Sequence, residues 1–171
     1  PESISRYLAP SSRDVLIESG IFTEKELESR VEVEYEKFTK KVQIESRVLA
    51  DLAINHIVPT GIKYMSSLLE NIRGLKEIFD EKEYERLAGT IKEAIVIISD
   101  HITMIKKLVF DMVEERKKAN IIADAYKKAL VYEKHVKPYL DSIRQHIDKL
   151  ELIVDDEIWP LPKYRELLFT S

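Results

Sequence analysis

The stretch DEKEYERLAGTIKEAIVIISDHITMIKKLVFDMV, residues 80–113, decides the fold of this chain. Asp80 followed three residues later by Glu83 has the spacing of a helix-capping box. Apolar side chains then recur every three or four residues, which is the period of one face of an α-helix. They are Tyr84, Leu87, Ala88, Ile91, Ala94, Ile95, Ile98, Ile102, Ile105, Leu108, Val109, Met112 and Val113. A helix of this length, about 50 Å at ~1.5 Å per residue, must pack along its length to be stable.

A second long helix is predicted earlier in the chain, starting at the capping box formed by Thr23 and Glu26. Its apolar stripe is Leu27, Val31, Tyr35, Phe38, Val42, Leu49, Leu52, Ala53 and Ile57. Glu45 falls on that stripe, where an unpaired charge would be costly, so a partner such as Arg47 or a cation from a neighbouring helix is expected. Pro59 predicts a kink, after which the helix resumes.

A third long element is predicted from about Ile121, with a bend at Pro138, and a short helix is predicted over residues 12–19, ending at Gly20. Three long amphipathic stretches bury one another best side by side. The sequence therefore predicts an all-α fold, an up-down antiparallel bundle of three to four long, proline-kinked helices with short terminal helices. At 171 residues, we expect one domain over residues 1–171.

The composition limits the classes of function. With 4 Gly, no Cys, 34% charged residues and a net charge of -4, the chain is typical of helix-rich soluble proteins and has no basic stripe for nucleic acid. Its longest apolar run, Ala94–Ile98, is far shorter than the roughly 20 residues that cross a membrane. The absence of cysteine favours a cytoplasmic location. A start at Pro1 rather than at Met suggests an excised segment.

The C-terminal sequence VDDEIWPLPKYRELLF, residues 154–169, breaks the helical pattern. Two prolines separated by one residue forbid a helix here, so the chain must leave its last long helix. The apolar side chains of this tail have too much surface area to remain exposed to water. We expect them to dock in a groove of their own bundle or of another chain. The residues expected to make this contact are Trp159, Tyr164, Leu168 and Phe169.

This ending, read together with FTEKELESR at residues 22–30, KVQIES at residues 41–46 and IVP at residues 57–59, resembles the C-terminal helical region of type III glutamine synthetases. The resemblance covers essentially the whole chain. It implies a non-catalytic C-terminal domain that contributes packing, oligomer assembly or regulation. The implied partners are an upstream catalytic domain and neighbouring subunits of a homo-oligomer.

The same resemblance implies a parent reaction, the ATP-dependent ligation of ammonia to glutamate. The family's cofactors, ATP and a divalent metal (Mg or Mn), would be bound upstream, so the resemblance implies none in this segment.

Four histidines are the obvious candidates for metal or proton chemistry: His56, His101, His135 and His146. None follows a Glu at the three-residue spacing of a di-iron bundle, and no two have the four-residue spacing of a zinc helix. The sequence therefore predicts no catalytic, cofactor or metal site. Two alternatives remain: an independent helical protein-interaction module and, less favoured, a histidine phosphotransfer bundle. His101, beside Asp100, is the candidate phosphoacceptor.

Overall fold

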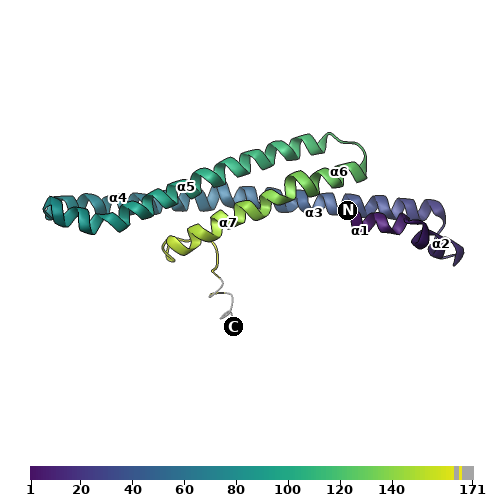
Figure 1. The fold of residues 1–171 in the computed structure, drawn as a ribbon, viewed down its shortest axis with the longest axis horizontal. Coiled ribbons are helices and arrows are strands. Elements are labelled where there is room, and N and C mark those ends of the chain that lie inside the picture. The colour runs from purple at the N-terminus through teal and green to yellow at the C-terminus, as the bar shows by residue number, and fades with distance from the viewer. Residues whose placement is uncertain (164–165, 167–171) are drawn as a thin grey trace. The chain divides into compact units, whose positions relative to one another are not determined.

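The computed structural model describes residues 1–163 and 166, and every regular element in that part of the chain is a helix. The predicted all-α class is therefore confirmed. In chain order (Figure 1), the elements are α1 (Glu2–Ser5), η1 (Arg6–Leu8), α2 (Pro10–Glu18), α3 (Glu24–Leu52), η2 (Ala53–Ile57), α4 (Val58–Ile78), α5 (Glu81–Asn120), α6 (Ala125–Val131), η3 (Tyr132–Val136) and α7 (Lys137–Ile153). No helix in the described part of the chain is long and apolar enough to cross a membrane.

The chain forms two compact units, each assembled from segments that are distant in the sequence. Unit 1 comprises Pro1–Val48 and Phe110–Leu140, and unit 2 comprises Leu49–Val109 and Asp141–Ser171. Each unit therefore takes one piece from each of the three long helical stretches predicted from the sequence. The expectation that residues 1–171 behave as one domain stays a prediction.

In unit 1, the first part of α3 packs against the end of α5 and against α6. Tyr35 on α3 lies beside Tyr126 on α6, with ring centroids 5.1 Å apart, and joins Val31 and Ala129 in a small core cluster. The chain reverses between α5 and α6 (Figure 1), so the two helices run in opposite directions within this unit.

A polar network lies further along α3 in unit 1. The fully buried Tyr132 donates its hydroxyl to Asn120 Oδ1 at 2.7 Å, and Gln43 Nε2 donates to the same oxygen at 3.2 Å. Ser46 is also fully buried, and its hydroxyl donates to the Gln43 carbonyl at 3.0 Å. Arg116 on α5 reaches the Ser46 hydroxyl at 3.5 Å.

The prediction that Glu45 lies on the buried apolar stripe of this helix is wrong. Glu45 is exposed, and its neighbour Ser46 occupies the buried face of α3. The apolar stripe shifts between Val42 and Leu49, and a small hydroxyl that finds its own hydrogen bonds costs far less to bury than a carboxylate.

In unit 2, α4 and α5 form a close antiparallel pair. A Cβ atom at Gly61 would lie only 3.0 Å from Ile102 Cδ1, so a glycine lets the two backbones approach. The core of this unit consists of fully buried apolar side chains from α5 and α7 together with the residues around η2: Ala53, Ile57, Ile98, Ile105, Ile143 and Leu150.

The predicted kinks at the two prolines take the form of π-helices. Pro59 and Pro138 each follow a five-residue π-helix by two positions. The residue before each proline donates its N–H five residues back, from Val58 to Ala53 and from Lys137 to Tyr132. Because a proline ring collides with the preceding turn and has no N–H, one wider turn lets the helix continue.

The predicted helix starts and stops agree with the structure at several points. Thr23 N–H donates to Glu26 Oε2 at 2.8 Å, and Glu83 N–H donates to Asp80 Oδ1 at 2.9 Å, as expected for capping. Gly20 adopts a φ of +70°. Two boundaries differ, because α2 begins at Pro10 and the third stretch becomes helical only at Ala125.

Candidate functional site

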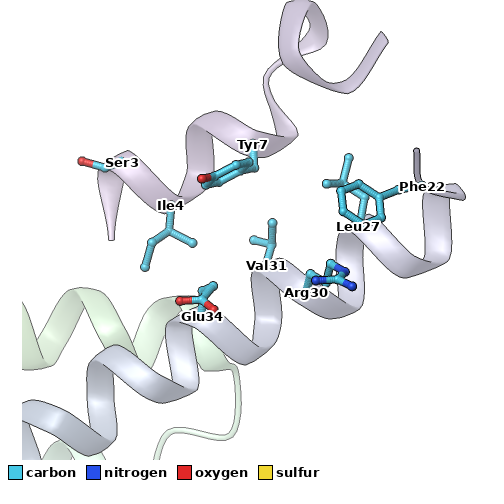
Figure 2. Close-up of a pocket in the computed structure, with 8 residues that line it drawn as sticks. All are labelled: Ser3, Ile4, Tyr7, Phe22, Leu27, Arg30, Val31 and Glu34. Atoms are coloured by element: carbon cyan, nitrogen blue, oxygen red, sulfur yellow. The ribbon is translucent and has the colours of Figure 1, made fainter. Parts of the chain in front are cut away.

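A cavity in unit 1 lies between the N-terminal helices and α3 (Figure 2). We call it the N-terminal socket. Its volume is about 480 Å³. In Figure 2, Ile4 on α1 and Tyr7 on η1 face α3, and Val31 on α3 faces them. The lining residues are Ser3, Ile4, Tyr7, Phe22, Leu27, Arg30, Val31 and Glu34.

The wall of the socket is apolar and its rim is charged. Leu27 and Val31 are 3% and 4% exposed, so the base of the socket is packed into unit 1. Arg30 lies over the Phe22 ring at 4.7 Å, a cation–π contact that holds one side of the opening. Glu34 lies one helical turn from Arg30, so the rim offers both a donor and an acceptor to a partner.

Several apolar side chains of the N-terminal residues are exposed, including Tyr7, which lines the socket. Tyr7 is 55% exposed, Val15 is 65% exposed and Ile21 is 59% exposed. Single exposed apolar residues are common on proteins, but a cavity with apolar walls and a half-exposed aromatic ring at its edge is typical of a surface that another chain covers. The N-terminal socket is therefore the best candidate for a docking site.

The tail residue Trp159 lies in unit 2 and is 8% exposed. A turn at Asp155 leads into it: Glu157 N–H donates to Asp155 Oδ1 at 2.9 Å, and Trp159 N–H donates to the Asp155 carbonyl at 3.1 Å. The acidic residues after α7 thus form a turn that brings the indole back onto its own unit. The docking role predicted for Trp159 stays a prediction.

Lys163 holds the start of the tail against the end of α7. Its Nζ donates to the Glu151 carbonyl at 2.8 Å, pairs with Asp156 and lies 5.9 Å from the centroid of the Trp159 ring. A cation suits this position because the last carbonyls of a helix lack intrahelical partners and carry partial negative charge. The other predicted anchors, Tyr164, Leu168 and Phe169, lie outside the described residues.

The structure also brings two of the four histidines together in unit 2. Nδ1 of His101 on α5 lies 2.9 Å from Nδ1 of His146 on α7, and the two rings meet edge to face. Both rings are half-buried. Burial lowers the pKa of both side chains; the His146 and Lys149 charges lower the pKa of His101 further, against Asp100, and Lys149 lowers that of His146.

These lowered pKa values predict an acid-sensitive fold. The folded state holds fewer protons on the pair than the unfolded state does, so the stabilisation is complete above the unfolded pKa of about 6.5 and is lost as the pH falls below it. We expect the melting temperature to fall between pH 7.5 and pH 5.5. The loss should be smaller when His101 and His146 are both replaced by Asn. An unchanged pH dependence in that double variant would contradict the prediction.

The phosphotransfer alternative finds little support in this geometry. It requires an accessible imidazole at position 101, but the ring is half-buried and its Nδ1 is engaged by His146. His56 and His135 are exposed and occupy equivalent places, each being the fourth residue of a π-helix.

Sequence reasoning missed the socket and the histidine pair. The socket depends on α1 and η1, which carry no strong helical period. The pair joins residues separated by 45 positions, and helix register alone does not reveal such a meeting.

Comparisons with known proteins point to one family. Residues 1–76 match the family model described as glutamine synthetase C-terminal domain. The chain is 58% identical over 171 residues to a glutamine synthetase of Bacteroides fragilis (strain YCH46), covering 100% of the chain and 24% of that protein.

Two more distant relatives extend the pattern. A type-3 glutamine synthetase of Dictyostelium discoideum is 25% identical over 177 residues, which cover 99% of the chain and 23% of that protein. A glutamine synthetase of Butyrivibrio fibrisolvens is 25% identical over 170 residues, which cover 99% of the chain and 24% of that protein. The chain spans about a quarter of the length of these curated relatives.

Proposed function

Because the chain belongs to the glutamine synthetases as their C-terminal domain, we propose that it is a non-catalytic helical domain that packs against the catalytic part of such an enzyme. The parent reaction proposed here is the ATP-dependent ligation of ammonia to glutamate. In this proposal, ATP and the divalent metal, Mg or Mn, belong to the catalytic part. The cytoplasmic location expected from the sequence stays a prediction.

The observation that carries this proposal is the N-terminal socket. A domain that works alone has little reason to leave an apolar cavity of about 480 Å³ with Tyr7 half exposed at its edge. Filling such a cavity with an apolar side chain contributes about 1.5–3 kcal/mol through burial. The socket is therefore suited to receive an apolar side chain from another part of the parent enzyme.

Neighbouring subunits are the second proposed partner. Unit 2 exposes apolar side chains of α4 and α5, including Ile62 at 48%, Leu69 at 45%, Val96 at 59% and Ile97 at 45%. These residues lie on helices, which present a rigid surface at low entropic cost. We propose that this surface, with the tail, contributes to a homo-oligomer.

The experiment compares the same substitution in two settings. Tyr7→Glu places a charge on the edge of the socket, where the side chain is already half exposed in this chain. In the isolated chain, the free energy of unfolding should change by less than about 0.5 kcal/mol, as for surface substitutions. In the full-length enzyme, the covered charge should weaken the contact by about 2 kcal/mol or more.

Tyr7→Phe is the matched control, because it keeps the ring and should leave the full-length enzyme unchanged. Both proteins are followed by thermal melting and by the pattern of limited proteolysis. If Tyr7→Glu has the same small effect in the full-length enzyme as in the isolated chain, the socket is not covered there and the proposal fails.

An independent interaction module is the second candidate, favoured by the same exposed apolar surface. This candidate differs from the first in the partner that the socket binds. A module would use its socket for a separate protein, so the full-length enzyme would leave residues 3–34 as accessible as the isolated chain does.

A further inference from the structure

We infer that His101 and His146 form a binding site for a divalent transition-metal ion that prefers imidazole ligands, such as Zn²⁺, Ni²⁺ or Cu²⁺, and that this ion clamps α5 to α7. This site is separate from the proposed docking function. It also differs in ligand chemistry from the oxygen-rich sites that Mg²⁺ occupies.

The distance between the two ring nitrogens carries the inference. Nδ1 of His101 and Nδ1 of His146 lie 2.9 Å apart, with the ring planes at 61°. Histidine nitrogens bind such ions at about 2.0–2.1 Å, so two ligands that meet the ion at about 90° lie about 2.9 Å from each other. The separation thus equals that of two adjacent ligands in octahedral or square-planar coordination, and tetrahedral Zn²⁺ requires it to open to about 3.3 Å.

Fully buried residues flank both histidines along their helices. His101 lies between Ile98 and Ile105 on α5, and both isoleucines are fully buried. His146 lies between Ile143 and Leu150 on α7, which are also fully buried. The two imidazoles therefore stand on the edges of a packed core, so an ion would find its ligands already positioned.

The protonation state agrees with a ligand role. Metal binding requires the neutral imidazole. Burial lowers the pKa of both side chains, so both are neutral at pH 7.5. Without an ion, one Nδ1–H donates to the other Nδ1; with an ion, both Nδ1 lone pairs face it and the protons sit on Nε2.

The surrounding charges predict a site of modest affinity. Lys149 lowers the pKa of both histidines and also repels a cation, whereas Asp100 acts on His101 in the opposite sense. In the described part of the chain, no group of three or more His, Cys, Asp or Glu side chains is placed to hold an ion. Water would therefore complete the coordination. Replacing Lys149 with Gln should tighten binding.

The test uses Ni²⁺ as a paramagnetic probe on the 171-residue chain at pH 7.5. The ring signals of the four histidines are followed by NMR as Ni²⁺ is added. We expect those of His101 and His146 to broaden together, at a Ni²⁺ concentration at least about tenfold below that which broadens the exposed His56 and His135. Equal broadening of all four rings would overturn the inference.

Calorimetric titration with Zn²⁺ provides the second measurement. One equivalent should bind the unsubstituted chain. Binding should weaken at least about tenfold in His101→Asn and in His146→Asn, and should persist when His56 and His135 are both replaced by Asn. If Zn²⁺ binding is the same with and without the pair, the two rings are joined only by a hydrogen bond. The NMR measurement needs no substitution, so it decides the matter even if a variant misfolds.

Discussion

Replacing Ile105 with Ala is expected to lower the free energy of unfolding by about 2–5 kcal/mol. Ile105 lies on α5 in unit 2 and is 0% exposed. Removing its side-chain carbons loses their burial and leaves a cavity that the surrounding helices cannot close fully. Ile98→Ala should have the same effect, because Ile98 is also 0% exposed and lies two turns earlier on the same face.

Ile97→Ala is the matched control on the same helix, since Ile97 is 45% exposed. Its effect should stay near that of a surface substitution, about 0.5 kcal/mol. Urea unfolding followed by circular dichroism measures all three variants, with stability taken from the midpoint at constant slope. A loss below half a kcal/mol at both Ile98 and Ile105 would mean that α5 faces the core with a different side.

Tyr132→Ala is expected to cost about 3–5 kcal/mol, the range for truncating a buried aromatic residue. Tyr132 begins the π-helix η3 in unit 1 and is fully buried. Its ring fills space beside α3, and its hydroxyl donates to Asn120 at 2.7 Å. Burial raises the pKa of this hydroxyl, so it remains a donor at neutral pH.

Tyr132→Phe separates the hydrogen bond from the packing. It should cost only about 0.5–1.5 kcal/mol, because Asn120 Oδ1 keeps its bond from Gln43 at 3.2 Å. The same urea measurement applies. If Tyr132→Phe is as damaging as Tyr132→Ala, the network rather than the ring stabilises this part of unit 1, and the packing argument is wrong.

The helices could be predicted from the sequence because their signals are local. Capping boxes at Thr23 and Asp80 and a period of three to four residues depend only on near neighbours in the chain. The prolines also act locally, so the kinks at Pro59 and Pro138 could be expected. The π-helical form of these kinks could not be predicted, because a π-helix and a broken helix both accommodate the proline ring and its missing N–H.

The side-chain contacts between helices could not be predicted. Tyr132 with Asn120, and His101 with His146, depend on how two helices rotate and slide against each other, and the apolar stripes leave several registers open. The error at Glu45 has the same origin. One residue of drift in a long stripe exchanges a buried position for an exposed one, and Ser46 carries no hydrophobic signal to mark it.

The tail was informative about the family but less so about its own structure. Its prolines and aromatic residues supported the resemblance that the comparisons then confirmed. The buried position of Trp159 depends on the turn at Asp155 and on Lys163, neither of which stands out in the sequence. The socket shows the same limit, since its upper wall comes from short helices with weak patterns.

Amide hydrogen exchange, measured on the 171-residue chain and on the full-length enzyme proposed as its parent, tests the central claim most directly. If this domain docks onto the rest of the enzyme through the N-terminal socket, the amides of α1, η1 and the first turns of α3 will exchange more slowly in the full-length protein. Equal exchange rates for these segments in both proteins would contradict the account.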